Sequence, residues 1–126
     1  MKAVLIVFLG GGLGSVLRLM VSRAAVDFKL HVVWGTFTVN IIGCLLIGLL
    51  VGWSNRVGWL SQEQLWFWTV GFCGGFTTFS TFALEGQQFL KEGQIVNFVL
   101  YALGSIIVGV LAVLLGFWLS RIGLTS

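Results

Sequence analysis

Charged residues are scarce in this sequence. Of its 126 residues, four are acidic and seven are basic, so charged side chains make up 9% of the chain while hydrophobic side chains make up 58%. This composition excludes an ordinary soluble domain and predicts a membrane protein. The basic residues form no cluster, so the net charge of +3 indicates contact with the membrane surface and argues against nucleic-acid binding.

Histidine and cysteine are also rare. The one histidine, His31, lies at the edge of an apolar run, and Cys44 and Cys73 lie inside such runs without CxxC spacing. These positions argue against a metal site built from Cys and His and against a structural disulfide. The apolar runs contain no His, Asp or Glu that could act as a general base, so we do not expect an enzyme.

Four long apolar runs occupy most of the chain. They cover residues 3–21, 32–53, 65–84 and 95–120, and only the first contains a charged residue, Arg18. Each is long enough to cross about 30 Å of hydrocarbon as a helix. The first run has no A-x-A-like cleavage site, so it is not predicted to be a removable signal peptide. We therefore predict one all-α transmembrane domain, residues 1–126, with four spans and short connections.

The third run contains an unusual segment, residues 71–82, with the sequence GFCGGFTTFSTF. Each glycine costs a helix about 1 kcal/mol relative to alanine, and Thr and Ser hydroxyls can bond the backbone and open the helix. We predict that the third helix is broken mid-membrane at residues 74–78, where protein or a polar cavity must surround it. Alternatively, Gly71 and Gly75 only permit tight helix packing, which would leave the TTFST run unexplained.

The first run combines small residues with one charge. Gly10 and Gly14 lie one helical turn apart, which predicts a face for close helix packing. Arg18 follows them near the end of the run. Its guanidinium either extends to the lipid head groups or attracts anions to a vestibule, and the first, structural interpretation is preferred.

Three runs each present a stripe of neutral polar side chains. The stripes consist of Thr36 and Asn40, of the hydroxyls at residues 77–81, including Ser80 and Thr81, and of Tyr101 and Ser105. The four carboxylates, Asp27, Glu63, Glu85 and Glu92, all fall at span ends or in loops. A proton-coupled or cation carrier usually needs an embedded acid, whereas neutral donors suit a passive anion conduit.

Two side chains within these stripes leave alternatives open. The Asn40 amide could donate to an anion or form an ordinary interhelical hydrogen bond, and the sequence favours neither. Phe79 and Phe82 lie three residues apart, and for a lone phenylalanine pair packing would be the simplest explanation. Among hydroxyl residues, however, their positive ring edges could also meet a small anion.

The basic residues at the span ends give no preferred orientation. An even number of spans places Lys2, Arg56 and Arg121 on one side of the membrane and Arg23, Lys29 and Lys91 on the other. Orientation follows the side that is richer in Lys and Arg, and here the two sides balance. We therefore predict a dual-topology protein that works as an antiparallel homodimer, in which two inverted copies replace the inverted repeat of larger transporters.

Four blocks of sequence resemble the Fluc (CrcB-type) fluoride channel family over nearly the whole chain. They are GGGLGSVLR, WGTFTVNIIGCLLIG, GFCGGFTTFSTFALE and Y..GSIIVGVLAVLLG, one from each span, and the third is the most specific. The resemblance implies a passive fluoride channel in the bacterial inner membrane, formed by an antiparallel dimer with two pores. It protects the cytoplasm by letting fluoride leave.

The resemblance also implies roles for individual residues. The pore residues would be Asn40, Phe79, Phe82, Tyr101 and Ser105, with Thr36, Ser80 and Thr81 contributing to a polar track. A structural sodium ion at the dimer centre would be held by the backbone carbonyls of Gly74 and Thr77 from both subunits, and hard cations do take oxygen ligands. Glu85 matches the acidic residue that closes the third block, without an assigned role.

Two other functions compete with this one. A dual-topology small multidrug-type exporter also has four short spans, but it requires an acid in the first span, where residues 3–17 have none. A membrane assembly protein without ion flux would have no use for polar stripes on three spans.

Overall fold

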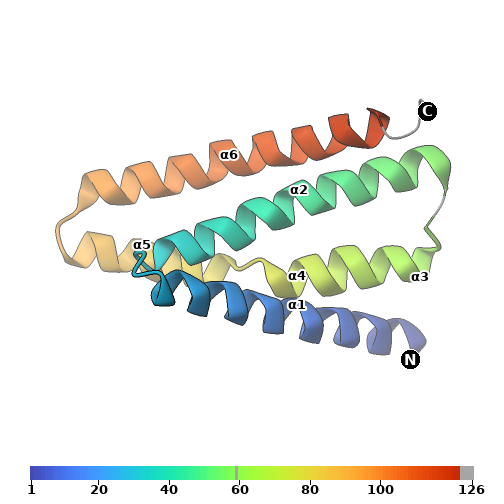
Figure 1. Ribbon diagram of the computed structural model, residues 1–126, viewed down its shortest axis with the longest axis horizontal. Helices are drawn as coiled ribbons and strands as arrows, with labels where there is room; N and C mark the ends of the chain where they lie inside the picture. The colour runs from blue at the N-terminus through green and yellow to red at the C-terminus, as the bar shows by residue number, and fades with distance from the viewer. Residues whose placement is uncertain (59, 123–126) are drawn as a thin grey trace.

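A computed structural model describes residues 1–58 and 60–122, and this part of the chain contains helices but no strand. Three helices are long and apolar enough to cross a membrane: α1 (Lys2–Asp27), α2 (Val33–Val57) and α6 (Ile95–Ile122). Between α2 and α6 lies an interrupted segment of four pieces: α3 (Gln62–Leu65), the π-helix η1 (Trp66–Cys73), α4 (Gly74–Phe76) and α5 (Phe79–Lys91). The all-helical class and the order of four helical segments agree with the prediction (Figure 1).

The helices extend beyond the apolar runs at several ends. Helix α1 continues to Asp27, and α5 continues past the predicted boundary at residue 84 to Lys91. Apolarity determines which residues lie in hydrocarbon, but a helix ends where its backbone is capped. Beyond α5 that point is Gly93, whose φ of 70° suits glycine. The expectation that Glu85 lies at a span end or in a loop was therefore wrong, because Glu85 is inside α5.

Two seams of close backbone contact hold the bundle together. Helix α1 packs on η1 and α4 where Gly10 and Gly14 lie against the backbone of Phe67 and Phe72. A Cβ on Gly10 would lie 2.5 Å from the Phe67 carbonyl oxygen, and a Cβ on Gly14 would overlap the Phe72 carbonyl. In the second seam, Gly48 and Gly116 bring α2 and α6 into similar contact. The absent side chains let the backbones approach, as is common in membrane helix pairs.

The third segment leaves helical conformation at Thr77 and Thr78. Thr77 has φ −81° and ψ 160°, Thr78 has φ −151° and ψ 122°, and α5 begins at the next residue. Gly74 and Gly75 are helical, so the interval predicted for the break, 74–78, was too wide. Gly75 instead packs against the backbone of Gly11, so the glycine pair serves packing while the threonines mark the interruption.

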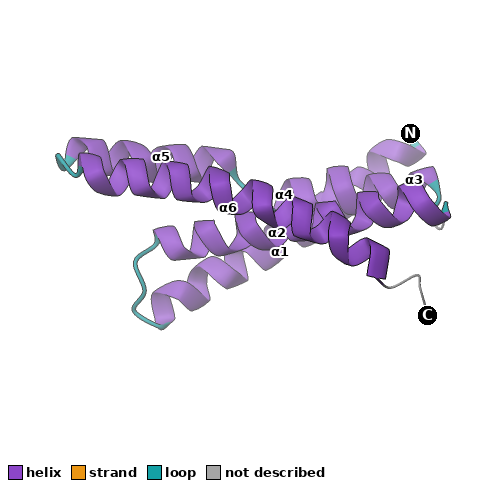
Figure 2. Cartoon of the chain, turned by 90° about the horizontal axis from the view of Figure 1, so that it is seen from above, coloured by secondary structure: helices purple, strands orange, loops and turns teal. Residues whose placement is uncertain are grey.

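The two ends of the bundle differ in shape. Helix α1 begins and α6 ends at the same end (Figure 1), where α2 also turns toward α3. At the opposite end, α5 and α6 run together away from α1 and α2 (Figure 2). The polar residues of α2, α5 and α6 lie toward this divergent end.

Candidate functional site

An inner cavity of about 280 Å³ lies beside the interruption. Its lining brings together residues of α2, the interruption, α5 and α6: Asn40, Cys44, Thr77, Thr78, Phe79, Phe82, Ser105 and Ile106. Four predicted pore residues, Asn40, Phe79, Phe82 and Ser105, thus share one cavity although they come from three separate helices. The Ser105 hydroxyl oxygen is buried and has no hydrogen-bond partner among the described residues, so it can donate to a group in this cavity.

Asn40 bonds the backbone of the interruption in both directions. Its Nδ2 donates to the Thr78 carbonyl oxygen at 3.1 Å, and the Thr78 N–H donates to its Oδ1 at 2.8 Å. The side-chain amide thus replaces the helical partners that Thr78 has lost, which a buried backbone group requires. The interhelical hydrogen bond considered from the sequence is present, and the second N–H of the amide is available for a ligand.

The hydroxyl residues after the interruption stabilise the start of α5. Thr78 is its N-cap: the Thr78 Oγ1 accepts from the Thr81 N–H at 3.2 Å and donates to the Thr81 Oγ1 at 3.1 Å. The Ser80 Oγ lies 3.4 Å from the same Thr78 oxygen. Such a cap satisfies backbone donors that a helix start leaves unpaired. Ser80 and Thr81 therefore support the capped turn and do not line the inner cavity.

A buried carboxylate joins two of the polar stripes. Glu85 is only 4% exposed; its Oε1 accepts from the Thr36 hydroxyl and its Oε2 from the Tyr101 hydroxyl, both at 2.7 Å. The expectation that the stripes contain no carboxylate was wrong. A usable signal was present in the sequence: Phe82, Glu85 and Phe89 are spaced three and four apart, so in a continuing helix they share one face.

The two predicted pore phenylalanines have different surroundings. The Phe82 ring lies 5.7 Å from the Phe79 ring and 5.0 Å from the Tyr101 ring, measured between centroids. Phe82 is thus held between α5 and α6. Phe79 is 79% exposed, an unusual state for a phenylalanine next to a buried threonine and an interrupted backbone.

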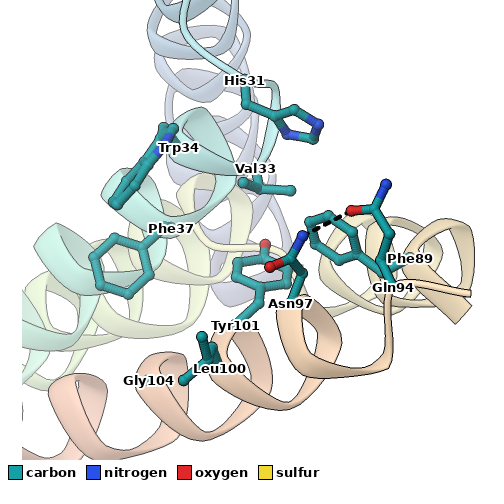
Figure 3. Close-up of a pocket in the computed structure, with 10 residues that line it drawn as sticks. All are labelled: His31, Val33, Trp34, Phe37, Phe89, Gln94, Asn97, Leu100, Tyr101 and Gly104. Carbon is teal, nitrogen blue, oxygen red and sulfur yellow. Dashed lines mark hydrogen bonds between the residues drawn. The ribbon is translucent and has the colours of Figure 1, made fainter.

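An outer cavity of about 520 Å³ opens at the divergent end of the bundle. His31, Trp34 and Phe37 lie on one side of it, and Phe89, Gln94, Asn97 and Tyr101 lie on the other (Figure 3). The Asn97 Nδ2 donates to the Gln94 Oε1 at 2.7 Å. Tyr101 lines this cavity and also bonds Glu85, while Ser105, one helical turn further along α6, lines the inner cavity. The two cavities therefore follow one another along α6.

Comparison with known proteins identifies the family. Residues 5–117 match the family model described as CrcB-like protein, Camphor Resistance (CrcB). The chain belongs to this family. Proteins named "Fluoride-specific ion channel FluC" are similar over nearly the full length of this CrcB-like chain. The one from Phocaeicola vulgatus is 46% identical over 96% of this chain and 100% of its own length. Those from Bacteroides fragilis and Gloeothece citriformis are 48% and 44% identical, over 96% and 98% of this chain and 98% and 100% of their own.

Family membership defines the class of protein. The CrcB-like chain is an ion-channel family member and not an enzyme, and its apolar helices make it a multi-pass protein of the bacterial cell membrane. Its described residues contain no group of three or more His, Cys, Asp and Glu side chains that could hold a metal ion. Any cation bound by this part of the chain would therefore need other ligands, such as backbone carbonyls.

The remaining predicted residues of the CrcB-like chain lie outside the cavities. Gly74 is exposed, and a Cβ built on it would meet nothing within 4 Å. The Thr78 N–H, four residues later, donates to Asn40, so it is not engaged with the Gly74 carbonyl. Arg18 is half-buried on α1 and forms no ion pair with residues that the structure describes. It borders neither the inner nor the outer cavity.

Proposed function

We propose that this chain forms a passive, fluoride-selective channel that lowers cytoplasmic fluoride by letting the ion leave down its gradient. The observation that carries the proposal is the inner cavity, where the Asn40 amide, the Ser105 hydroxyl and the Phe82 ring converge. The fluoride-specific channels named among the relatives support the choice of ion.

The chemistry of this cavity suits fluoride. Fluoride is small and strongly hydrated, so a path must replace its water with several close donors at once. Ser105 offers a buried hydroxyl without a partner and Asn40 offers a second N–H, while the positive edge of a phenyl ring adds a weak donor. In a low-dielectric setting each such contact is stronger than in water. Chloride is larger, so a narrow path would exclude it by size.

Two copies of the chain would complete the channel. Phe79 is 79% exposed and Gly74 is open to the surroundings, yet an interrupted backbone at membrane depth must be covered by protein or line a polar cavity. A second copy would provide that cover. The balance of basic residues between the two ends supports the inverted arrangement, so the proposed assembly is an antiparallel dual-topology dimer with two pores.

A structural sodium ion at the centre of this dimer fits the chemistry of the interruption. The predicted ligands are the carbonyls of Gly74 and Thr77, and hard cations take oxygen ligands. The Gly74 carbonyl has lost the N–H of Thr78 to Asn40, and α4 ends at Phe76, where a helix presents its negative end. Bound there, sodium would hold the two interrupted segments together.

Proton-coupled export, as in a small multidrug-type exporter, is the second candidate function. The buried Glu85 favours it, because coupled carriers usually contain an embedded acid. Against it, both carboxylate oxygens already accept a hydroxyl hydrogen bond, from Thr36 and Tyr101. An imposed pH gradient without a fluoride gradient would drive uptake by a coupled carrier and would leave a passive channel inactive.

The decisive experiment is fluoride efflux from proteoliposomes that contain the purified protein. A potassium ionophore supplies the balancing charge, and a fluoride electrode records the release. We expect rapid, ionophore-dependent fluoride efflux without a matching chloride leak. Absence of efflux from a well-folded, monodisperse protein would contradict the proposal.

Accessibility labelling would test the dual topology. A cysteine tag placed after residue 122 should react with membrane-impermeant reagents from both sides of the cell membrane, in similar yield. Labelling from one side alone would reject the antiparallel dimer while leaving the fluoride assay unaffected.

A further inference from the structure

We infer that Cys44 lines the ion path at its narrow end and that the small size of its side chain there limits what can pass. This inference rests on the proposed function, because it concerns the same inner cavity. It adds a residue to the path for which neither the sequence motifs nor the chemistry of the cavity assigned a role.

Cys44 is placed on the polar face of α2. It follows Asn40 by one helical turn, just as Gly109 follows Ser105 by one turn on α6. A Cβ built on Gly109 would lie 3.5 Å from the Cys44 sulfur, so the thiol points across to α6. Cys44 is half-buried, its thiol is free, and it lines the inner cavity together with Asn40 and Ser105.

The two helices close immediately beyond this position. One turn after Cys44, Gly48 packs against the backbone of Val113, and Gly116 packs against the backbone of Leu45. No side chain separates the helices at these contacts, so the space between them ends at Cys44 and Gly109. Cys44 therefore bounds the inner cavity where α2 and α6 meet.

A second observation points to a ligand at this end of the cavity. The buried Ser105 hydroxyl has no partner among the described residues, and a buried polar group without a partner costs about 1–3 kcal/mol unless a ligand or water satisfies it. A small ion bonded to Ser105 would lie one helical turn from the Gly109 level, where Cys44 crosses. A larger group on residue 44 would occupy that space.

Thiol modification of the folded protein tests this inference directly. With methyl methanethiosulfonate, the Cys44 thiolate attacks the reagent sulfur, a mixed disulfide forms, methanesulfinate leaves and the thiol proton goes to water. We expect modification at Cys44, read by mass spectrometry, to lower fluoride efflux at least about tenfold, and dithiothreitol to restore it. In Cys44→Ala, which retains the buried Cys73, the same reagent should leave efflux unchanged.

Substitutions provide a second test that needs no reagent. Cys44→Ser keeps the size and should retain efflux within about threefold, whereas Cys44→Leu should lower it at least about tenfold. Ile42→Phe adds comparable bulk on an exposed part of α2 and should conduct normally. If Cys44→Leu does not fold, the reagent experiment on folded protein still decides.

Three outcomes would overturn the inference: Cys44 modified in full without loss of efflux, Cys44 unreactive in a conducting protein, or a folded Cys44→Leu variant that conducts normally. Failure of the proposed function looks different, because the unmodified protein would then carry no fluoride at all.

Discussion

Two neighbouring parts of the third segment, the glycine seam and the interruption, show different ways of departing from an ordinary membrane helix. In the glycine seam (Gly10, Gly14, Gly71 and Gly75), missing side chains bring α1 and the third segment into backbone contact, and both remain helical. At the interruption, Thr77 and Thr78 are extended, and hydrogen bonds from Asn40 replace the helical ones. Glycines therefore mark where helices meet, whereas the break occurs where side chains can satisfy an open backbone.

The largest effect should come from filling the glycine seam. Gly14→Val would push side-chain atoms into the carbonyl of Phe72, and because that obstacle is backbone, we expect a loss of stability of about 3 kcal/mol or failure to fold. Gly12→Val is the matched control, since nothing lies within 4 Å of a Cβ at Gly12. Yield and thermal unfolding in detergent would measure both. Equal stability of the two variants would mean that the seam does not hold the bundle.

The next largest effect should come from the bond that holds the interruption open. Asn40→Asp keeps the acceptor for the Thr78 N–H but replaces the donor to the Thr78 carbonyl with a negative oxygen. We expect fluoride efflux to fall about a hundredfold while the dimer still assembles. Asn97→Asp adds the same charge in the exposed outer cavity and should have little effect. Unchanged efflux in Asn40→Asp would remove this residue from the ion path.

A smaller loss is expected when the aromatic ring beside the interruption is removed. Phe82→Ile keeps an apolar side chain in α5 but loses the ring edge and the contact with Tyr101. We expect efflux to fall about tenfold with little change in thermal stability. If efflux stayed at the level of the unmodified protein, Phe82 would serve packing alone.

The smallest effect should come from one hydrogen bond to the buried carboxylate. Tyr101→Phe keeps the ring against Phe82 and removes only the donor to Glu85, so we expect a stability loss of about 1–2 kcal/mol and a few-fold change in efflux. Thr36→Val removes the other donor. A double-mutant cycle in thermal unfolding should give a coupling between the two sites, because both bond the same group. Strict additivity would indicate that the carboxylate is held by other contacts.

The sequence was sufficient to predict the helical class, the order of the helical segments and several residues of the inner cavity. Hydrophobic run length predicts helices in a membrane because every backbone group must be bonded internally. Spacing by four residues was enough to associate Thr36 with Asn40 and Tyr101 with Ser105, since such residues share a helix face.

The errors have a common physical cause. The glycine pair at 74–75 was included in the break because glycine weakens an isolated helix, but here α1 supplies contacts that only glycine permits. Glu85 was placed near a loop because apolarity ended at residue 84, yet donors from α2 and α6 compensate for its burial. Both outcomes depend on neighbours from other segments, which local sequence patterns do not contain.

The π-helix η1 makes the length of the chain itself a structural parameter. Within it, the Gly74 N–H reaches back five residues to the Thr69 carbonyl, one residue further than in an α-helix. Deleting one residue from Trp66–Cys73 would allow ordinary α-helix to form, but everything after it would rotate by about 100° relative to α3. Thr78 would then turn away from Asn40. Between the Ser61 cap of α3 and the interruption, point substitutions should thus be tolerated at many positions where a single deletion is not.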